Sequence, residues 1–579
     1  MTEAALNKVI ALPVQVGSVT VHVAKGRRWS VVEHLLLEAV AQNASTAANL
    51  ATAANLPLRM VIEALINLMR AGWLELQASP QGNLFAATAG GRALVGRDEL
   101  PVSTRLVKRP VRYAVDRLSG SVLRYRELDF MWTKRFRQVE PEVDAIIKPA
   151  ANIAEARQLD LIQALLDEDE EYRGLVPSSA RVGDGYALVR VIDGKVRGLS
   201  SASAQLKQRI VEAAANAAGR RAEVTVTGLR RPGLQFAKRA VAISPDDLVI
   251  GGDEHRALLR KIITSANAWI TIHSTFVGGG SSAEMLDLVT TAARERGVLV
   301  DIFWGKSDRP DTFNDTRAAS AAINERMNRE GLQQFVRAHP FPTDSHAKFV
   351  VADDGKGGFL AVLGSCNWLS SNFDSFELST RTSDALLVSD IMEACAQMVT
   401  TATGLNGGIA TTLAGQAINI RKMNGQRTGR RGEAQIVLGP QHAEFVLKAR
   451  DQAEQSIVIG SHRFGRSADA LSLTPTRAKV DAGGIDAIVY YGRLSDGLTP
   501  TQAAELRITH NQAGMRIRQI VDPRMHAKFL SWDDDNVVIT SHNLLSADPS
   551  NDFAELGIHM RVNGIARRLR EKLLVTFRT

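Results

Sequence analysis

Cysteine, long apolar runs and a recognisable leader are what this sequence lacks. Its only cysteines, Cys366 and Cys395, cannot form a disulfide framework, which favours a reducing compartment. No apolar run approaches the roughly 20 residues that cross a bilayer. The amino-terminal stretch MTEAALNKVIALPVQVG has neither the basic region nor the long apolar region of a signal peptide. We therefore expect a cytoplasmic protein without a membrane span.

The overall composition is that of a globular protein with a modest excess of positive charge. Apolar residues make up 45% of the 579 residues and charged residues 23%, which excludes a disordered or fibrous chain. There are 70 Lys and Arg residues against 62 Asp and Glu residues, a net charge of +8. That excess is compatible with a polyanionic partner but does not prove one. The length predicts three to four domains.

Residues 1–100 resemble a winged helix-turn-helix domain. Two amphipathic segments, WSVVEHLLLEAVAQN and LRMVIEALINLMRAG, predict helices, and Ser45–Thr46 can cap a short helix between them. The second segment ends at Gly72, and WLELQA and NLFAAT follow as two strands. The third helix of such domains usually enters the major groove. Here its only basic residues are Arg59 and Arg70, so a protein-binding or dimerising role is equally compatible with the sequence.

Residues 101–245 form an intermediate region that we assign to the α+β class. Its basic stretch 105–137 has interleaved aromatic residues and includes Arg109 and Arg112. This pattern fits a nucleic-acid surface, and it fits a solvated helical face equally well. Further on, YALVRVIDGKV predicts a β-hairpin that turns at Asp193–Gly194.

Beyond residue 245 the chain repeats itself. The segments EHRALLRKIITSANAWITIHS and QHAEFVLKARDQAEQSIVIGS align, as do VLVDIFWGKSD with IDAIVYYGRLSD and SHAKFVVAD with MHAKFLSWD. Helix-then-strand units in series predict an α/β sandwich in each half, the first over 246–425 and the second over 426–579. We expect the halves to be related by a pseudo-twofold axis, with a basic linker between them.

The repeated blocks carry a chemical motif. H-x-K-x4-D occurs in both halves, followed by G-S-C-N or T-S-H-N and then by F-E or A-E. The pair resembles the signature of the phospholipase D superfamily over about residues 246–579. The resemblance implies a site formed by the residues that follow. They are His346, Lys348, Ser365, Asn367 and Glu377 in the first half, and His526, Lys528, Ser541, Asn543 and Glu555 in the second.

The motif has a physical interpretation that is independent of the family. Strand-like residues flank it, so alternation is expected to put His and Lys, two residues apart, on one strand face. Two halves would then bring two imidazoles to opposite sides of one phosphorus, for in-line displacement with a covalent phosphohistidine. Glu377 and Glu555 are the natural partners of the imidazole N–H groups. Zinc ligation is disfavoured because each His has a Lys two residues away, so we expect no metal or other cofactor.

The resemblance also implies roles for individual residues. Asp353 and Asp533 of the motifs are expected to be structural. The first-motif His346 is expected to be the nucleophile and His526 the general acid. The second half departs from the family pattern with Thr540 in place of Gly, which removes no reactive group. His273 and His462 end the aligned strands and are candidates for the lining of the cleft.

The substrate we favour is a nucleic acid, DNA ahead of RNA. A metal-independent nuclease with accessory domains would by analogy suit bacterial defence, including antiviral defence, or DNA processing. The alternatives are a lipid hydrolase or transferase of phospholipase D type and a non-enzymatic DNA-binding regulator. A homodimer or a partner protein is left open. The basic residues that we expect to bind nucleic acid are Arg109, Arg112, Arg421, Lys422, Arg427, Arg430 and Arg431.

Overall fold

The computed structural model describes residues 7–577 apart from short internal segments. Those segments are 28, 80–81, 97–99, 101–102, 140–141, 150–157, 168–169, 177–180, 218–221, 227–233, 280–281, 306–309, 404–407, 424–431 and 547–553. The protein is mixed α/β, as predicted. It forms two compact units, described separately below. Unit 1 comprises Met1–Val19, Arg112–Leu165 and Pro177–Thr579, and unit 2 comprises Thr20–Val111 and Leu166–Val176.

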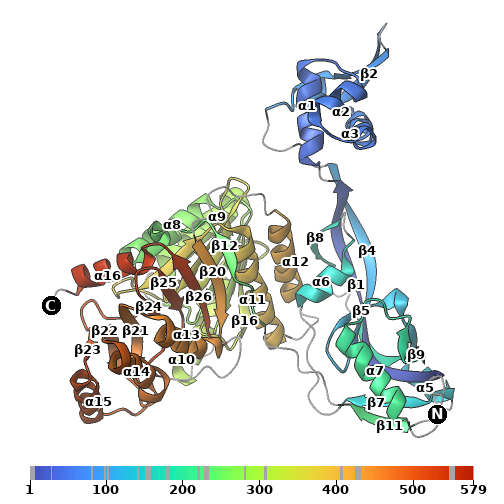
Figure 1. The fold of residues 1–579 in the computed structure, drawn as a ribbon. Helices are drawn as coiled ribbons and strands as arrows, with labels where there is room; N and C mark the ends of the chain where they lie inside the picture. Colours follow the sequence, from blue (N-terminus) through green and yellow to red (C-terminus); the bar gives the residue numbers. More distant parts are fainter. Residues whose placement is uncertain are drawn as a thin grey trace. The chain divides into compact units, whose positions relative to one another are not determined.

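The helical part of unit 2 has three helices and a hairpin in the predicted order (Figure 1). Ser30 caps the first helix, and its hydroxyl accepts a hydrogen bond from the Glu33 amide in a capping box. Thr46 caps the second helix in the same way. The assignment as a winged helix stays a prediction. The elements are α1 (Val31–Gln42), α2 (Ala47–Ala54), α3 (Leu58–Arg70), β2 (Leu74–Ser79), β3 (Gly82–Ala87) and α4 (Ala89–Arg92).

A long first strand takes part in both units. Strand β1 (Asn7–Arg27) pairs antiparallel with β8 (Glu170–Leu175) inside unit 2. Inside unit 1 its earlier residues pair antiparallel with β9 (Arg181–Ile192). The predicted hairpin follows, because β9 turns into β10 (Lys195–Arg197) through Asp193 and Gly194, both at positive φ. The other elements before residue 245 are β4 (Ser103–Asp116), β5 (Val122–Arg124), β6 (Asp129–Trp132), α5 (Thr133–Val139), β7 (Ala145–Pro149), α6 (Gln158–Leu165), α7 (Ala204–Asn216), β11 (Ala222–Val226) and β12 (Arg239–Val241).

The first repeated half forms a seven-stranded mixed sheet in the order β13-β19-β18-β17-β14-β15-β16. Its apolar core lies between this sheet and the helices α8, α9 and α10. The bounds are β13 (Leu248–Ile250), α8 (Gly252–Ser265), β14 (Trp269–Ser274), α9 (Ser282–Arg296), β15 (Leu299–Trp304), α10 (Pro310–Arg329), β16 (Val336–Pro342), β17 (Phe349–Asp353), β18 (Phe359–Gly364) and β19 (Leu378–Thr382).

The second half repeats this order as β20-β26-β25-β24-β21-β22-β23, with β12 added at the edge next to β20. The same strand order in both sheets agrees with the duplication inferred from the sequence. The bounds are β20 (Gly432–Leu438), α13 (Gln441–Gln452), β21 (Ser456–Phe464), α14 (Thr474–Gly483), β22 (Asp486–Leu494), α15 (Pro500–Gln512), β23 (Met515–Gln519), β24 (Phe529–Trp532), β25 (Asn536–Thr540), β26 (Leu556–Val562) and α16 (Ile565–Thr576).

Two helices between the halves were not predicted. Helix α11 (Ala385–Thr403) and helix α12 (Gly408–Lys422) pack along each other (Figure 1). Both are almost entirely buried, so neither has the polar face that reveals a helix in a sequence. Asp390 on α11 lies in their core and forms ion pairs with Arg421 and with Arg239 of β12.

Candidate active site

The two histidine motifs lie just before the strands that the sequence predicted would contain them. Strand β17 begins at Phe349, so His346 and Lys348 precede it, and the prediction that both lie on one strand face is wrong. The reason is a different backbone partner. The His346 amide donates to the carbonyl of Ala554 in the other half at 2.7 Å. In the second motif, the His526 amide donates to Phe376 at 3.0 Å.

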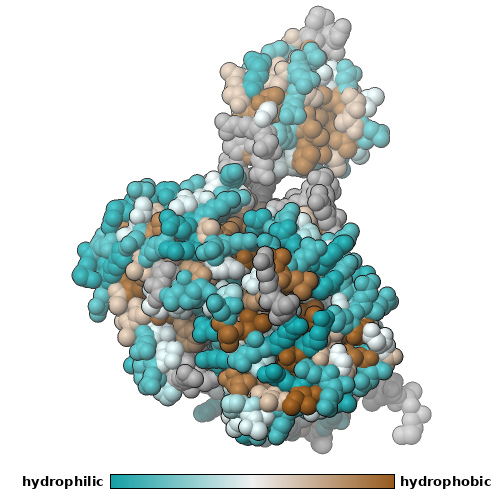
Figure 2. Space-filling model, turned by 90° about the vertical axis from the view of Figure 1, so that its left-hand side faces the viewer, coloured by the Kyte–Doolittle hydropathy of each residue, from teal (hydrophilic) through white to brown (hydrophobic). Residues whose placement is uncertain are grey.

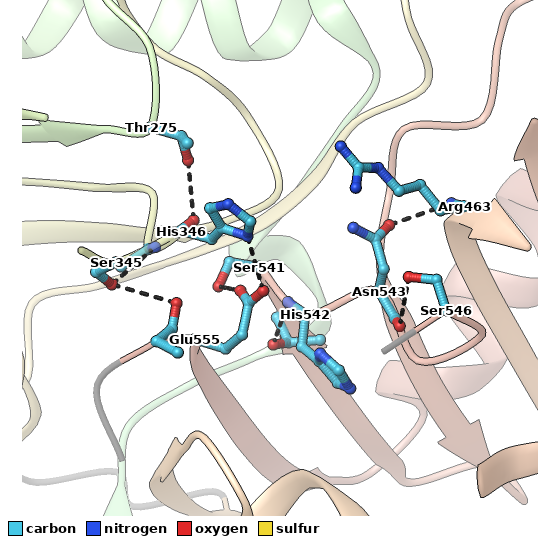
Figure 3. A network of polar contacts seen from close by, with 12 residues as sticks. Thr275, Ser345, His346, Arg463, Ser541, His542, Asn543, Ser546 and Glu555 are labelled. Carbon is cyan, nitrogen blue, oxygen red and sulfur yellow. Dashed lines mark hydrogen bonds and ion pairs between the residues drawn. The ribbon is translucent and has the colours of Figure 1, made fainter. Parts of the chain in front are cut away.

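Each motif histidine contacts a glutamate of the opposite half, next to these main-chain bonds. Nδ1 of His346 lies 3.1 Å from Oε1 of Glu555 (Figure 3). Nδ1 of His526 lies 2.7 Å from Oε1 of Glu377. Each half therefore supplies the carboxylate that orients the other half's imidazole. Because Nδ1 faces a carboxylate, Nε2 of each ring is left for chemistry. The sequence predicted the glutamates as partners but not this exchange.

The motif serines fix the glutamates. Ser365 Oγ donates to Oε2 of Glu377, and Ser541 Oγ donates to Oε2 of Glu555. Both hydroxyls also accept a backbone N–H, from Leu378 and from Leu556, each at 3.0 Å. The serines are thus committed to positioning carboxylates.

Electrostatics keep both glutamates ionised. Burial would raise the pKa of Glu377, but His526, its hydrogen bond and Lys528 outweigh burial and lower it to about 2. Burial likewise opposes ionisation of Glu555, yet His346, its hydrogen bond and other nearby cations hold its pKa well below the usual range. Burial also lowers the pKa of His526, to about 4, despite the opposing effect of Glu377.

Both motif lysines are buried beside the histidines. Nζ of Lys348 donates to Thr275 Oγ1 at 2.6 Å and to the His346 carbonyl, and Nζ of Lys528 donates to the His526 carbonyl at 2.7 Å. Burial lowers the pKa of Lys348 to about 8. For Lys528, burial and then the charge of Lys348 lower the pKa to about 7. Each ammonium keeps donor capacity for an anionic ligand.

One cavity collects these groups from both halves. His346, Lys348, Asn367, His526, Lys528, Ser541 and Asn543 line it, so the structure brings most of the predicted site residues together. The carboxylates of Glu377 and Glu555 contact the two histidines of this lining. The two asparagines differ, because Asn543 Oδ1 accepts the Arg463 amide, whereas Asn367 Oδ1 has no partner among the described residues. Residues of the lining that the analysis of the sequence did not assign are Thr275, Phe276, Arg463 and Arg493.

The candidate histidines at the strand ends differ in position. His462 lines the cavity, its ring packs edge-on against His526 at 4.6 Å, and its Nδ1 lies 3.0 Å from the Met525 carbonyl. His273 is fully buried behind the first motif, bonded to Ala347 and Thr343. The signal for Arg463 and Arg493 was present in the sequence, since each is the next-to-last residue of a strand of the duplicated core.

The motif aspartates lie away from the cavity. The carboxylate of Asp353 accepts backbone N–H groups from Asn267, Ala268 and Trp269, where α8 leads into β14. Asp533 does the same for residues 454–456 in the second half. Both therefore tie the start of a central strand to the end of the motif strand.

The unusual Thr540 is compensated on the neighbouring strand. In the first half, Nε2 of His255 bonds to Ser379 Oγ at 2.8 Å. In the second half, Nε2 of His442 bonds to Thr540 Oγ1 at 2.6 Å, and Gly557 occupies the position of Ser379. A Cβ on Gly557 would meet His442 Nε2 at 2.8 Å and Thr540 Cβ at 2.9 Å. In each half one hydroxyl therefore hydrogen-bonds to the buried histidine of the helix, but it comes from β19 in the first half and from β25 in the second.

Four of the basic residues predicted to bind nucleic acid lie in the described part of the chain, and none of the four lines this cavity. Arg109 forms ion pairs with Asp167 and Glu170 inside unit 2. Arg112 lies over the Tyr125 ring at 5.5 Å. Arg421 bonds to Asp390 and Glu393, and Lys422 ends α12 with a partner of its own. Arg427, Arg430 and Arg431 lie outside the described residues.

Two further features concern the described residues as a whole. No three His, Cys, Asp or Glu side chains come together in a way that could hold a metal ion. None of the described helices is long and apolar enough to cross a membrane.

Comparison with known proteins agrees with this geometry. Residues 259–399 match the family model "Cardiolipin synthase, PLD-like domain". With the second motif in a duplicated half, the site is of phosphodiesterase or phosphotransferase type. The match covers the first repeated half, which is therefore similar to a phospholipase D-like domain. No curated protein sequence matches it.

Three solved structures are similar to parts of this chain at low identity. Phosphatidylserine synthase from Haemophilus influenzae is 16% identical over 60% of this chain and 88% of its own, with a TM-score of 0.42. A mutant of yeast tyrosyl-DNA phosphodiesterase is 11% identical over 56% and 91%, with a TM-score of 0.35. Nuc from Salmonella typhimurium is 19% identical over 25% and 94%, with a TM-score of 0.22. These scores are too low to bear on the substrate.

Proposed function

We propose that the protein cleaves the phosphodiester backbone of a nucleic acid, DNA ahead of RNA, through a phosphohistidine intermediate and without a metal ion. The observation that carries the proposal is the pair of crossed His–Glu contacts facing one cavity with two buried lysines. Such a cavity offers a nucleophile, an acid and cationic donors for the phosphate oxygens.

The steps follow from the atoms that face the cavity. Nε2 of one histidine attacks the phosphorus, and the bond to the leaving oxygen breaks as the other histidine gives that oxygen its proton. The second histidine then takes a proton from water, whose oxygen attacks the phosphorus and releases the first histidine. Lys348 and Lys528 hold the non-bridging oxygens throughout.

The surroundings of the two histidines favour His526 as the nucleophile, the reverse of what the family resemblance implied. The His526 side chain is 15% exposed, against 31% for His346, and it has the shorter carboxylate contact. His462 packs against its ring, and the lowered pKa keeps it neutral near pH 7. A nucleophile must be unprotonated, as the lowered pKa of His526 provides, which leaves the role of general acid to His346.

The cavity lining favours a polar polymer over a lipid. Arg463 and Arg493 join the two lysines there, and Phe276 is the one apolar side chain among the described lining residues. Phosphate chains suit a cationic lining, whereas acyl chains need an apolar wall. The match to a cardiolipin synthase model makes transfer or hydrolysis of a phosphatidyl group the second candidate.

A substrate panel tests the proposal. The full chain is incubated in excess EDTA with single-stranded DNA, duplex DNA, RNA and phosphatidylcholine vesicles. We expect nucleic-acid cleavage that disappears in a variant carrying both His346→Ala and His526→Ala, purified in parallel to exclude a contaminating nuclease. Choline release without strand cleavage would favour the lipid candidate. Loss of activity in EDTA that Mg²⁺ or Zn²⁺ restores would contradict the metal-independent mechanism.

A further inference from the structure

Helix α3 of unit 2 is apolar on its outer side as well as its inner side. Val61, Leu65 and Leu68 fill the core of the unit. On the exposed side, Leu58 and Ile66 are 47% and 41% exposed, and Ile62 between them is 37% exposed. Residues four apart are neighbours on a helix, so these three form one continuous stripe. We call it the α3 stripe.

A stripe of this kind marks an interaction surface. Most surface helices present polar residues to water, and contiguous exposed apolar side chains occur mainly where another molecule binds. Figure 2 shows hydrophobic surface, in brown, on the part of the molecule that contains α1–α3. Leu76 of the adjacent hairpin strand β2 is also exposed.

The charges beside the stripe disfavour a DNA-reading helix. Such a helix needs polar and basic side chains that reach base edges and phosphates. Here Arg59 and Glu63 lie along one edge of the α3 stripe, and the carboxylate would face the phosphates of a duplex. Neither side chain forms an ion pair within the described residues, so both are available to a partner.

The same arrangement is complementary to itself. In a twofold, antiparallel pairing centred on Ile62, Leu58 meets Ile66 of the second copy, and the central isoleucines meet each other. The edge of the stripe that carries Arg59 and Glu63 then lies beside the same edge of the second copy. Arg59 is therefore next to Glu63 of the second copy, and the twofold axis generates the pair a second time. An isologous contact of this kind needs one patch that matches itself in shape and charge.

We propose that the α3 stripe is a homodimer interface, in which α3 packs antiparallel against α3 of a second copy with two Arg59–Glu63 ion pairs at its edge. The proposal is independent of the catalytic chemistry, because it concerns unit 2 alone.

The test is sedimentation equilibrium of the full chain at several concentrations, with circular dichroism to show that each variant is folded. We expect a dimer for the wild type, a monomer for Ile62→Asp, and a dimer for the control Leu574→Asp, which changes a leucine on α16 that is more exposed than Ile62. A monomeric wild type or a dimeric Ile62→Asp variant would overturn the proposal.

A charge exchange gives a second test that does not depend on the apolar change. Arg59→Glu and Glu63→Arg should each weaken dimerisation by about tenfold, because the symmetry makes every change act twice. The double variant should recover most of the wild-type affinity. If the double variant is no tighter than the single variants, the antiparallel contact is wrong. If Ile62→Asp weakens binding to duplex DNA without changing the oligomeric state, α3 is a DNA-binding helix and the proposal falls.

Discussion

Each motif histidine is held by a carboxylate from the opposite half of the chain. Glu377 serves His526 and Glu555 serves His346, and each glutamate is fixed in turn by the serine of its own half. Neither half therefore holds a complete set of groups. This dependence explains why both motifs keep every polar residue even though the halves have diverged elsewhere.

Lys528 is the residue where function and stability oppose each other. Folding lowers its pKa from 10.5 to about 7, first through burial and then through Lys348. Between these values the unfolded chain binds more protons than the folded one, so this group makes stability rise as pH increases from about 7 towards 10.5. Below pH 7 the folded state must carry the buried charge in full.

We expect Lys528→Met to abolish phosphodiester cleavage while raising the melting temperature at pH 6. The gain should shrink towards pH 10, because there the wild-type lysine is neutral in the folded protein. Calorimetry from pH 6 to pH 10 measures this, with Lys572→Met, on the exposed side of α16, as the control. If Lys528→Met lowers the melting temperature at pH 6, the buried ammonium stabilises the folded state, which would contradict this prediction.

At the scale of elements, the strands β25 and β26 lead into the site and carry the relocated hydroxyl. Thr540→Gly should leave Nε2 of His442 without its partner and cost about 1–3 kcal/mol. Gly557→Ser should also destabilise, because its Cβ would be crowded by Thr540 and His442. The double variant should recover part of the loss, since it recreates the arrangement that Ser379 provides in the first half.

Chemical denaturation of the four proteins in this cycle gives the coupling between the two positions. We expect a coupling of about 0.5–3 kcal/mol in the stabilising direction. Additive losses would mean that the two strands do not share one hydroxyl site. If the variants lose cleavage activity in proportion to their loss of stability, the hydroxyl site also helps to hold Glu555 in position.

The sequence predicted elements where a periodic pattern or a turn signal was present. The hairpin at Asp193–Gly194 and the strand pair β2 and β3 are examples. It could not reveal α11 and α12, whose residues are buried on nearly every side and so show no amphipathic pattern. His346 and Lys348 were assigned to a strand because their neighbours have strand-forming side chains. The backbone there bonds across the halves instead, a contact between residues about 200 positions apart.

At the scale of the whole molecule, the duplication joins two halves, each with an incomplete set of site residues, into one site. The two sheets share one strand order, and an isolated β-bridge between Phe376 and Met525 joins the halves beside the second motif. The motifs could be listed from the sequence, but the exchange of glutamates depends on how the halves pack.

The central claim is that both halves form one site that works through a phosphohistidine. It is tested most directly by mixing the chain with a p-nitrophenyl phosphodiester in excess EDTA, quenching at alkaline pH and mapping the adduct by mass spectrometry. We predict p-nitrophenol release and an adduct on His526, retained in His346→Ala because this leaving group needs little protonation and absent from His526→Ala. An adduct on His346 would reverse the two roles. Release without an adduct on either histidine, or no release until a metal ion is added, would contradict the account.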